Sequence, residues 1–328
     1  MARVLTGIQS TGTPHLGNIL GAIQPAIEMA KDSKNESFLF IADLHSLTQI
    51  KDGALLRENT YAVAAAWLAF GLDTSRTVFY RQSDVPEVTE FAWYLSCYFP
   101  YQRMTLAHSF KDKSDRLADV NAGLFNYPML MAADILLYDA QLVPVGKDQL
   151  QHLEMTRSVA QRINHQIDPK HGSEILVVPE AMTFGTTMSV PGTDGAKMSK
   201  STGNTLDVFA DPKDLKKAIN KQIITDATPL EDPKDPDGSV VYKLCEILMS
   251  ADDAAEMASK LRAGGYGWGH AKKALLEALV DGYAEPRARF SELMADRGAV
   301  DAELKIGAEK AREVAAQTLA RVRTAIGY

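Results

Sequence analysis

The sequence is poor in cysteine and has no long apolar run. Cys97 and Cys245 lie far apart without a Cys-x-x-Cys pattern, which argues against a disulfide framework or a cysteine zinc site. The most apolar stretch, Tyr127–Val145, is interrupted by Asp134, Asp139 and two prolines, so it is too broken to span a bilayer. The N-terminus lacks the charged-then-apolar pattern of a signal peptide. These absences predict a cytoplasmic protein that does not enter a membrane.

Basic residues are fewer than acidic residues. With 35 Lys and Arg against 42 Asp and Glu, the net charge of −7 argues against broad, non-specific coating of nucleic acid. It does not exclude a local basic patch, and for each lysine cluster taken alone a solvated helix face is the simpler interpretation. The two clusters are Lys213, Lys216, Lys217 and Lys221, and the pair Lys272 and Lys273.

The first part of the chain alternates between short apolar runs and helical patterns. This β-α-β-α rhythm predicts an α/β fold with a parallel sheet, and such sheets bind ligands beyond the carboxyl ends of their strands. The expected strands are Arg3–Gln9, Ser37–Asp43, Thr77–Arg81, Gln141–Val145 and Glu174–Val178. The expected helices are Gly17–Lys31, Ala54–Phe70, Glu87–Tyr98, Tyr127–Tyr138 and Asp148–Ile163.

The pattern changes after residue 206. Helix-forming residues dominate and no strand pattern remains, so a C-terminal all-helical domain is expected. We place the boundary near residue 206, with the last helix a candidate to pack back on the first domain. The expected helices are 212–225, 240–250, 251–263, 268–294 and 301–326.

A glycine-rich strand-to-helix turn lies at residues 7–21. Gly7-Ile8-Gln9 precedes Thr13-Pro14-His15-Leu16-Gly17-Asn18, and glycines here allow a ligand to approach the backbone. The following helix N-terminus suits phosphate, and His15 and Asn18 share one face of its first turn. Alone, this segment would be explained equally well by a plain turn between a strand and a helix.

A second motif, Lys197-Met198-Ser199-Lys200-Ser201, lies about 180 residues later with glycines on both sides. The flanking glycines predict a loop that closes over substrate, and its two lysines could neutralise charge on pyrophosphate. A solvated basic loop is the alternative, but two motifs in this order favour nucleotide chemistry.

A third segment, Val145–His152, has the same layout of strand, glycine turn and helix. Gly146 permits close backbone approach, and Asp148 is either an N-cap or a carboxylate that accepts hydrogen bonds from ribose hydroxyls. Asp148 and His152 could share a metal ion, but no third ligand pattern lies nearby.

A fourth site is the helix after Tyr127. Tyr127, Met131 and Asp134 share one helix face, a stripe that usually belongs to a core. A carboxylate in this apolar setting requires a donor, which could be a ligand N–H or O–H, a neighbouring backbone group or an arginine.

Together the four sites resemble the bacterial tryptophanyl-tRNA synthetases of class I. His15–Asn18 stands for the HIGH signature, written His-Leu-Gly-Asn, and Lys197–Ser201 is the KMSKS loop letter for letter. The segments most specific for this family are Met131–Tyr138 (MAADILLY) and Pro144–Gln149 (PVGKDQ). The resemblance runs through essentially the whole chain.

The resemblance implies a Rossmann-like catalytic domain over residues 1–206, with a dimer-forming insertion near 100–175. Residues 207–328 would form a helical domain that binds the tRNA anticodon. The implied substrates are ATP, L-tryptophan and tRNA(Trp), with Mg²⁺ bound through the ATP phosphates and no metal site on the protein. A homodimer is implied as well.

The resemblance also assigns residues. Phosphate stabilisation is implied for His15, Asn18, Lys113, Lys197 and Lys200. ATP binding is implied for Gln9, Ser10, Thr11, Gly17, Asn18, Gly146, Lys147, Asp148, Thr187, Lys197, Met198, Ser199, Lys200 and Ser201. Tryptophan binding is implied for Leu5, His45, Tyr127, Met131, Asp134 and Gln149, with the Asp134 carboxylate on the indole N–H.

The chain departs from the family pattern at several positions; Leu5, for example, stands where the family often has Phe, which would loosen one wall of the amino-acid pocket. Asp134 could accept from a phenol as well as from an indole, so a tyrosyl-tRNA synthetase is the nearest alternative. A non-catalytic regulatory module derived from a synthetase and another nucleotidyl transferase are further ones. The intact lysines and glycines argue against the regulatory module.

Overall fold

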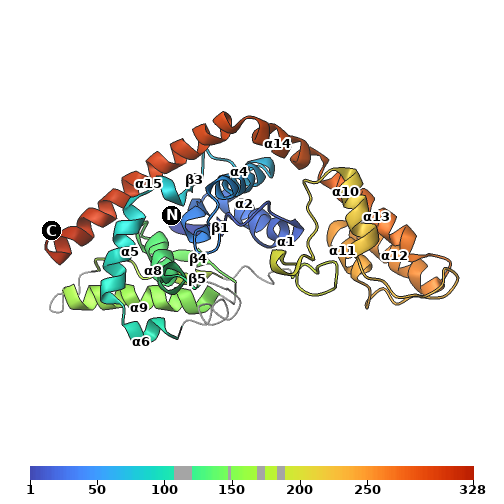
Figure 1. Cartoon of the computed structure of the whole chain (residues 1–328), viewed down its shortest axis with the longest axis horizontal. Coiled ribbons are helices and arrows are strands. Elements are labelled where there is room, and N and C mark those ends of the chain that lie inside the picture. Colours follow the sequence, from blue (N-terminus) through green and yellow to red (C-terminus); the bar gives the residue numbers. More distant parts are fainter. Residues whose placement is uncertain (107–119, 147–148, 168–173, 183–188) are drawn as a thin grey trace.

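The centre of the molecule is a parallel sheet of five strands in the order β3-β2-β1-β4-β5 (Figure 1). The computed structural model describes residues 1–106, 120–146, 149–167, 174–182 and 189–328. This order is that of a doubly wound Rossmann-like sheet, which confirms the predicted fold class. The strands are β1 (Ala2–Gln9), β2 (Asn35–Ala42), β3 (Val78–Arg81), β4 (Leu142–Pro144) and β5 (Glu180–Met182).

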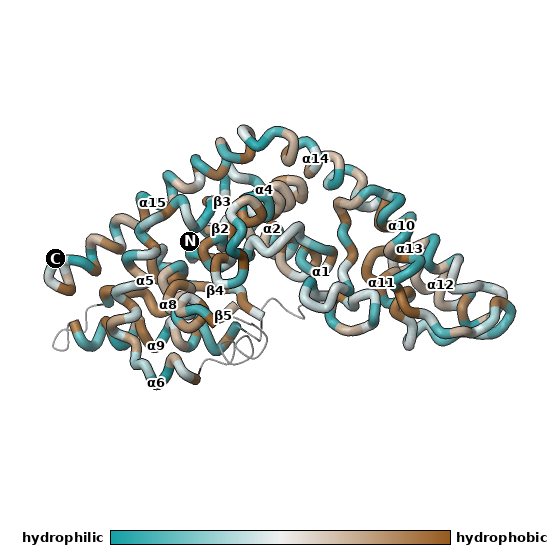
Figure 2. Tube along the Cα trace, in the orientation of Figure 1, coloured by the Kyte–Doolittle hydropathy of each residue, from teal (hydrophilic) through white to brown (hydrophobic). Residues whose placement is uncertain are grey.

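Both faces of the sheet are covered by helices. All residues of β2 from Ser37 to Ala42 are buried, as expected of a parallel strand packed on both sides. Leu39 and Ile41 join the core beneath α2 (Gln24–Lys31) and α4 (Gly53–Ala69), whereas Phe38 and Phe40 join the core beneath α5 (Glu87–Tyr98) and α8 (Ala122–Leu136). Figure 2 shows the apolar residues gathered between the sheet and these helices.

The helices connect the strands and then form the C-terminal part. After β1 the chain forms α1 (Leu16–Asn18), a π-helical turn (Ile19–Ile23) and α2 (Gln24–Lys31). Those around the other strands are α3 (Asp43–Ser46), α4 (Gly53–Ala69), a 3₁₀ turn (Gln82–Asp84), α5 (Glu87–Tyr98), α6 (Tyr101–Met104), α8 (Ala122–Leu136) and α9 (Leu150–Ile167). A 3₁₀ turn (Lys200–Thr202) precedes α10 (Pro212–Gln222), α11 (Val240–Leu248), α12 (Ala251–Ala263), α13 (Trp268–Gly282), α14 (Ala284–Ala295) and α15 (Arg297–Ile326).

The last helix, α15, runs back across the edge strand β3 and α5 (Figure 1). Its Gly307 lies directly on the backbone of Phe79, where a Cβ atom would come within 1.8 Å of the Phe79 carbonyl oxygen. Ion pairs hold the same helix at its sides, from Arg312 to Glu87 and from Arg323 to Glu90. Residues 297–326 are therefore fixed to the sheet-bearing part of the chain.

The strand expected at Glu174–Val178 is not formed; the fifth strand is Glu180–Met182. Side chains form the hydrogen bonds to the backbone of this segment that a neighbouring strand would otherwise have formed. The Asn164 side chain accepts from the Leu176 N–H at 2.9 Å and donates to the Leu176 carbonyl at 2.8 Å. Arg321 donates to the Ile175 carbonyl at 2.7 Å. The apolar run Ile175–Leu176 is buried, but as a loop.

The single helix expected over 268–294 is two helices, α13 and α14, separated at Tyr283. Tyr283 has φ −115° and ψ 18°, outside helical geometry. Pro286 explains the break, because its ring would clash with the carbonyl of residue 282 in a continuous helix and it has no N–H to donate there.

In the described ranges, every helix falls short of the length or the apolarity that crossing a bilayer requires. The domain boundary near residue 206 and the insertion near 100–175 stay predictions.

Candidate active site

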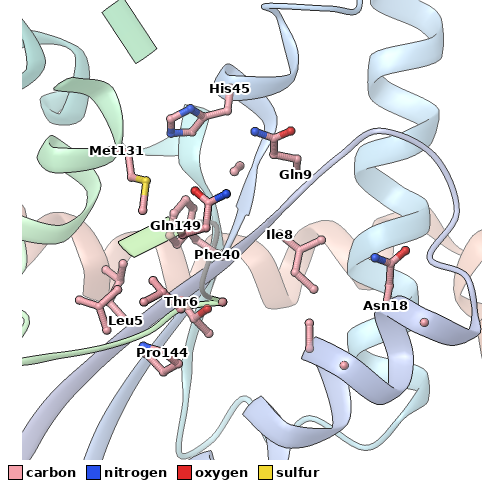
Figure 3. A pocket seen from close by; sticks show the side chains of 18 of the residues that line it. Leu5, Thr6, Ile8, Gln9, Asn18, Phe40, His45, Met131, Pro144 and Gln149 are labelled. Carbon is pink, nitrogen blue, oxygen red and sulfur yellow. The ribbon is translucent and has the colours of Figure 1, made fainter. Parts of the chain in front are cut away.

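A cavity of about 840 Å³ opens at the carboxyl ends of β1 and β4, where the strand order reverses (Figure 3). Parallel sheets bind ligands at this point. Of the residues expected to bind ATP or an amino acid, those in its wall are Leu5, Gln9, His15, Gly17, Asn18, His45, Tyr127, Met131, Asp134, Gly146, Gln149, Lys197, Met198 and Ser199. The structure therefore brings the four sequence sites together.

Some expected residues lie elsewhere. Ser10 is buried and its Oγ donates to Ser46 Oγ at 3.1 Å. Thr11, Lys200 and Ser201 are not part of the cavity wall, although Lys200 lies over the neighbouring turn. Lys113, Lys147, Asp148 and Thr187 fall outside the described residues.

Asp134 is the buried acid of the cavity. Its carboxylate is 3% exposed and accepts from His45 Nε2 at 2.8 Å. The Gln82 amide donates to both of its oxygens, at 2.7 and 2.9 Å. Burial raises the pKa of Asp134, whereas the hydrogen bonds from His45 and Gln82 oppose that rise. These fixed donors satisfy the acid on one side, and the other side faces the cavity.

Gln82 itself has a fixed orientation. It is 1% exposed, and its Oε1 accepts from the backbone N–H of Leu44 at 3.1 Å and of His45 at 3.4 Å. With its oxygen bound to two N–H groups, its NH₂ must point at Asp134. The backbone N–H groups that follow β2 therefore fix the orientation of the Gln82 amide, and this amide in turn orients the Asp134 carboxylate.

A second chain of hydrogen bonds links two residues of the cavity wall, Tyr127 and Gln149, through the buried His152. Tyr127 Oη lies 2.6 Å from His152 Nε2, and His152 Nδ1 lies 3.2 Å from Gln149 Oε1. Figure 3 places Met131, His45 and Gln149 around one part of the cavity. His152 thus orients two of the side chains expected around the amino acid. Among the described residues, no group of three His, Cys, Asp or Glu side chains is arranged to hold a metal.

The turn after β1 provides the other half of the cavity. Gly12 has φ +122°, a conformation that side-chain-bearing residues rarely adopt. His15 precedes α1, and its backbone N–H donates to Asn18 Oδ1 at 3.2 Å. Burial and the nearby charge of Lys200 lower the pKa of His15 to about 4, so the imidazole is neutral at pH 7. It is therefore available as a neutral hydrogen-bond donor rather than as a cation.

The Lys197–Ser201 loop is docked on this turn. The buried Met198 accepts a hydrogen bond on Sδ from the Gly17 N–H at 3.3 Å. Further along, the Leu16 N–H donates to the Leu206 carbonyl at 2.9 Å. A side chain at Gly12 would meet Lys200 Nζ at 3.1 Å, so this ammonium lies directly over the glycine turn. Burial lowers the pKa of Lys200 to about 8, although the charge of Asp207 raises it.

Residues 1–284 match a family model described as tRNA synthetases class I (W and Y). The chain belongs to this family.

Relatives of this tRNA synthetase match it over almost their whole length. The tryptophan–tRNA ligase of Rhodopirellula baltica is 46% identical over 325 residues, 99% of either chain. The tryptophan–tRNA ligase of Neisseria meningitidis is 42% identical, and the match covers 99% of this chain and 97% of that protein. The tryptophanyl-tRNA synthetase of Campylobacter jejuni, solved with ADP and tryptophan, has a TM-score of 0.93 at 41% identity, covering 99% of this chain and all of that one.

The sequence of this class I synthetase did not indicate two residues, Gln82 and Asn204, that hold the site in place. Gln82 follows β3 directly, and a polar residue at that place in a predicted parallel strand is the signal that could have found it. Asn204 accepts from the Ser199 N–H at 2.7 Å and donates to Asp194 at 2.7 Å and to the Lys197 carbonyl at 3.2 Å. It braces the Lys197–Ser201 loop from within.

The wall around Leu5 contains an aromatic ring after all. Phe40 of β2 lies against Gly7, where a Cβ atom would come within 2.6 Å of the ring. Leu5 and Phe40 both line the cavity (Figure 3). The smaller residue at position 5 of this synthetase is thus accompanied by a ring from the neighbouring strand.

Proposed function

We propose that the protein is a tryptophan–tRNA ligase. In the first step the tryptophan carboxylate attacks the α-phosphorus of ATP, and the bond from that phosphorus to the bridging oxygen of pyrophosphate breaks. In the second step a hydroxyl of the terminal ribose of tRNA(Trp) attacks the acyl carbon, and AMP leaves. The relatives named above and the ADP and tryptophan of the Campylobacter jejuni structure support this assignment.

The observation that favours tryptophan in this chain is the fixed acid, Asp134. An ionised carboxylate has about four acceptor positions, and His45 and Gln82 occupy three. The position that faces the cavity is assigned to the indole N–H. The remaining residues around the indole and the amino-acid backbone are Leu5, His45, Tyr127, Met131 and Gln149.

For ATP, we assign the phosphates to the turn after β1 and the docked loop. Neutral His15 and Asn18 donate hydrogen bonds from one side, and Lys197 and Lys200 neutralise charge from the other. Lys113 has the same assigned role. Mg²⁺ is assigned to the ATP phosphate oxygens, where it would neutralise part of their charge. The other residues assigned to ATP are Gln9, Ser10, Thr11, Gly17, Gly146, Lys147, Asp148, Thr187, Met198, Ser199 and Ser201.

Pyrophosphate exchange into ATP, with each of the twenty amino acids in turn and without tRNA, tests the proposal. Exchange with tryptophan alone is expected, because the indole combines an N–H donor for the buried acid with a large apolar ring system that fills the cavity. Exchange with tyrosine instead would keep the chemistry and overturn the specificity. Absence of exchange with every amino acid, in a folded protein, would favour a regulatory module or an enzyme that needs tRNA before it acts.

The pH dependence of activation should report Lys200. Its ammonium is charged below a pKa of about 8 and neutral above it, so kcat/KM for ATP should fall as the pH rises through 8. Lys200→Arg keeps its charge at every accessible pH, so its profile should stay flat until the amino group of tryptophan titrates. Exchange rates between pH 6.5 and 9.5 measure both profiles. A decline at the same pH in both proteins would remove Lys200 from this role.

We also propose a homodimer that works in the cytoplasm. Exposed apolar side chains gather on α5, on α6 and just beyond α6, with Trp93 67%, Tyr101 68% and Leu106 59% exposed. Cys97 lies exposed one turn after Trp93. Large exposed apolar side chains on consecutive elements favour an interaction site, and a second copy of the chain is the occupant we assign. Sedimentation at twice the mass of 35.8 kDa is the expected result.

A further inference from the structure

One face of α10 carries four lysines. Lys213, Lys216, Lys217 and Lys221 follow one another at helical spacing and are all exposed. Leu215 and Ile219, which anchor the helix in the core, lie on the opposite face. The four lysines, called the α10 lysine face below, therefore form one stripe that points away from the protein.

The charge of the α10 lysine face is not neutralised within the described part of the chain. None of its lysines forms an ion pair there, whereas Lys260 pairs with Glu256 at 2.6 Å and Lys273 with Glu277 at 3.6 Å. The Asp211 carboxylate caps the helix through the Lys213 N–H at 2.8 Å. Asp214 is the acidic residue within α10, at the edge of the stripe.

These lysines weaken the helix that carries them. Like charges three or four positions apart, as in the pairs 213–216, 213–217 and 217–221, repel each other. Lys213 also lies in the first turn, where the helix dipole disfavours a cation, whereas Lys221 lies in the last turn, where the dipole favours one. The protein as a whole is acidic, with a net charge of −7. Repulsion among these unpaired lysines offsets what the helix dipole gains at Lys221, so the concentration of positive charge points to an anionic partner.

The end of α10 is held by neighbouring segments: Ile224, just after the helix, donates from its backbone N–H to the carbonyl of Thr193, four residues before the Lys197–Ser201 loop, at 3.0 Å. Lys272 of α13 donates to the carbonyls of Asn220 at 3.2 Å and Ile223 at 2.8 Å, which ties the end of α10 to its neighbour. The 3₁₀ turn of the Lys197–Ser201 loop ends ten residues before α10 begins. In Figure 1, α10 lies beside α13, the helix against which it packs.

We propose that the α10 lysine face binds the sugar–phosphate backbone of tRNA without reading its bases. This inference rests on the proposed function, because that function supplies the tRNA. Lysine suits the role, since its ammonium binds phosphate as a point charge and lacks the planar fork with which arginine reads guanine. Each phosphate contact releases a counterion, so the contribution of this face depends steeply on salt.

The test compares two variants in aminoacylation of a tRNA(Trp) transcript. The first changes Lys213, Lys216, Lys217 and Lys221 to Gln; the second changes Lys260 and Lys273, which are exposed and already paired, to Gln. The α10 variant should lose at least about tenfold in kcat/KM for tRNA at moderate salt. Its slope of log(kcat/KM) against log(salt) should be shallower by roughly 3, from four charges at about 0.7–0.9 each. The control variant should keep the wild-type values.

The outcomes separate this inference from the proposed function. Pyrophosphate exchange with tryptophan needs no tRNA and should be unchanged in both variants, and thermal unfolding should occur at or above the wild-type temperature because repulsion has been removed. If the wild type exchanges and aminoacylates but the α10 variant keeps its kcat/KM and salt slope, the inference is wrong. An equal loss in the control would assign the effect to overall charge and overturn it too. A wild type without exchange would instead overturn the proposed function.

Discussion

Asp134→Asn should lower kcat/KM for tryptophan in pyrophosphate exchange by about 100-fold, which corresponds to about 3 kcal/mol of lost transition-state binding. The reason is the geometry of the buried acid. In the wild type, the Asp134 carboxylate accepts hydrogen bonds from His45 and Gln82 on one side. In the variant, the NH₂ of the asparagine would place a donor against these donors or against the indole N–H. The KM for ATP should change little, because the turn after β1, to which we assign the phosphates, lies at the other end of the cavity.

Discrimination against an analogue is the decisive measurement for Asp134. Tryptophan and an analogue whose ring nitrogen is replaced by sulfur have similar shapes but differ in the N–H. The wild type should prefer tryptophan strongly, and Asp134→Asn should lose most of that preference. Gln82→Met, which keeps the carboxylate but removes its amide donor, should give an intermediate result. An unchanged preference in Asp134→Asn would exclude the acid as the indole partner.

Gly307→Ala should lower the free energy of unfolding by about 3 kcal/mol and the Tm by roughly 5–10 °C. The added methyl group would lie 1.8 Å from the Phe79 carbonyl oxygen and 2.5 Å from its carbon, both backbone atoms of a sheet strand. Neither can rotate away, so α15 would have to lift from β3 and release the contacts and ion pairs along its length. This cost outweighs the gain of about 1 kcal/mol that alanine brings to a helix interior.

Gly298→Ala is the matched control for this effect. Gly298 is exposed in the first turn of the same helix, and an added Cβ would approach nothing closer than Asp296 Oδ1 at 3.4 Å. Here the helix propensity of alanine acts alone, so the Tm should stay the same or rise. Thermal unfolding of both variants, followed by circular dichroism, makes the comparison. Equal stability of the two variants would contradict the close contact between α15 and β3.

The fold class could be predicted from the sequence because the signals for it are local. Buried strands such as β2 are continuous apolar runs, and they alternate with helical periods that bring the ends of β1 and β4 together. The fifth strand could not be placed, because Ile175 and Leu176 have the composition of a strand. Their backbone groups are bonded by Asn164 and Arg321, which lie 12 and 146 positions away. Apolar composition indicates burial, and only the fold decides which partner bonds the backbone.

The candidate site, like the fold, could be predicted from the sequence only in part. The sequence located Asp134, Tyr127 and the Lys197–Ser201 loop, because unusual residues stand there in unusual patterns. It did not indicate Gln82, which lies 52 positions from Asp134 and whose importance comes from where its amide is aimed. Nor did it indicate that His15 would be neutral, since burial and the charge of Lys200 arise only once two distant segments meet.

The position of α15 at the end of the chain has a consequence for synthesis on the ribosome. β3 is an edge strand, and the helix that covers it is residues 297–326, made more than 200 residues after the strand itself. At roughly 5–20 residues per second, the edge and its apolar surroundings stay uncovered for about ten seconds or longer. During that interval the nascent sheet offers an open edge to other unfinished chains. The newborn protein is therefore most vulnerable to misassembly just before its last helix emerges.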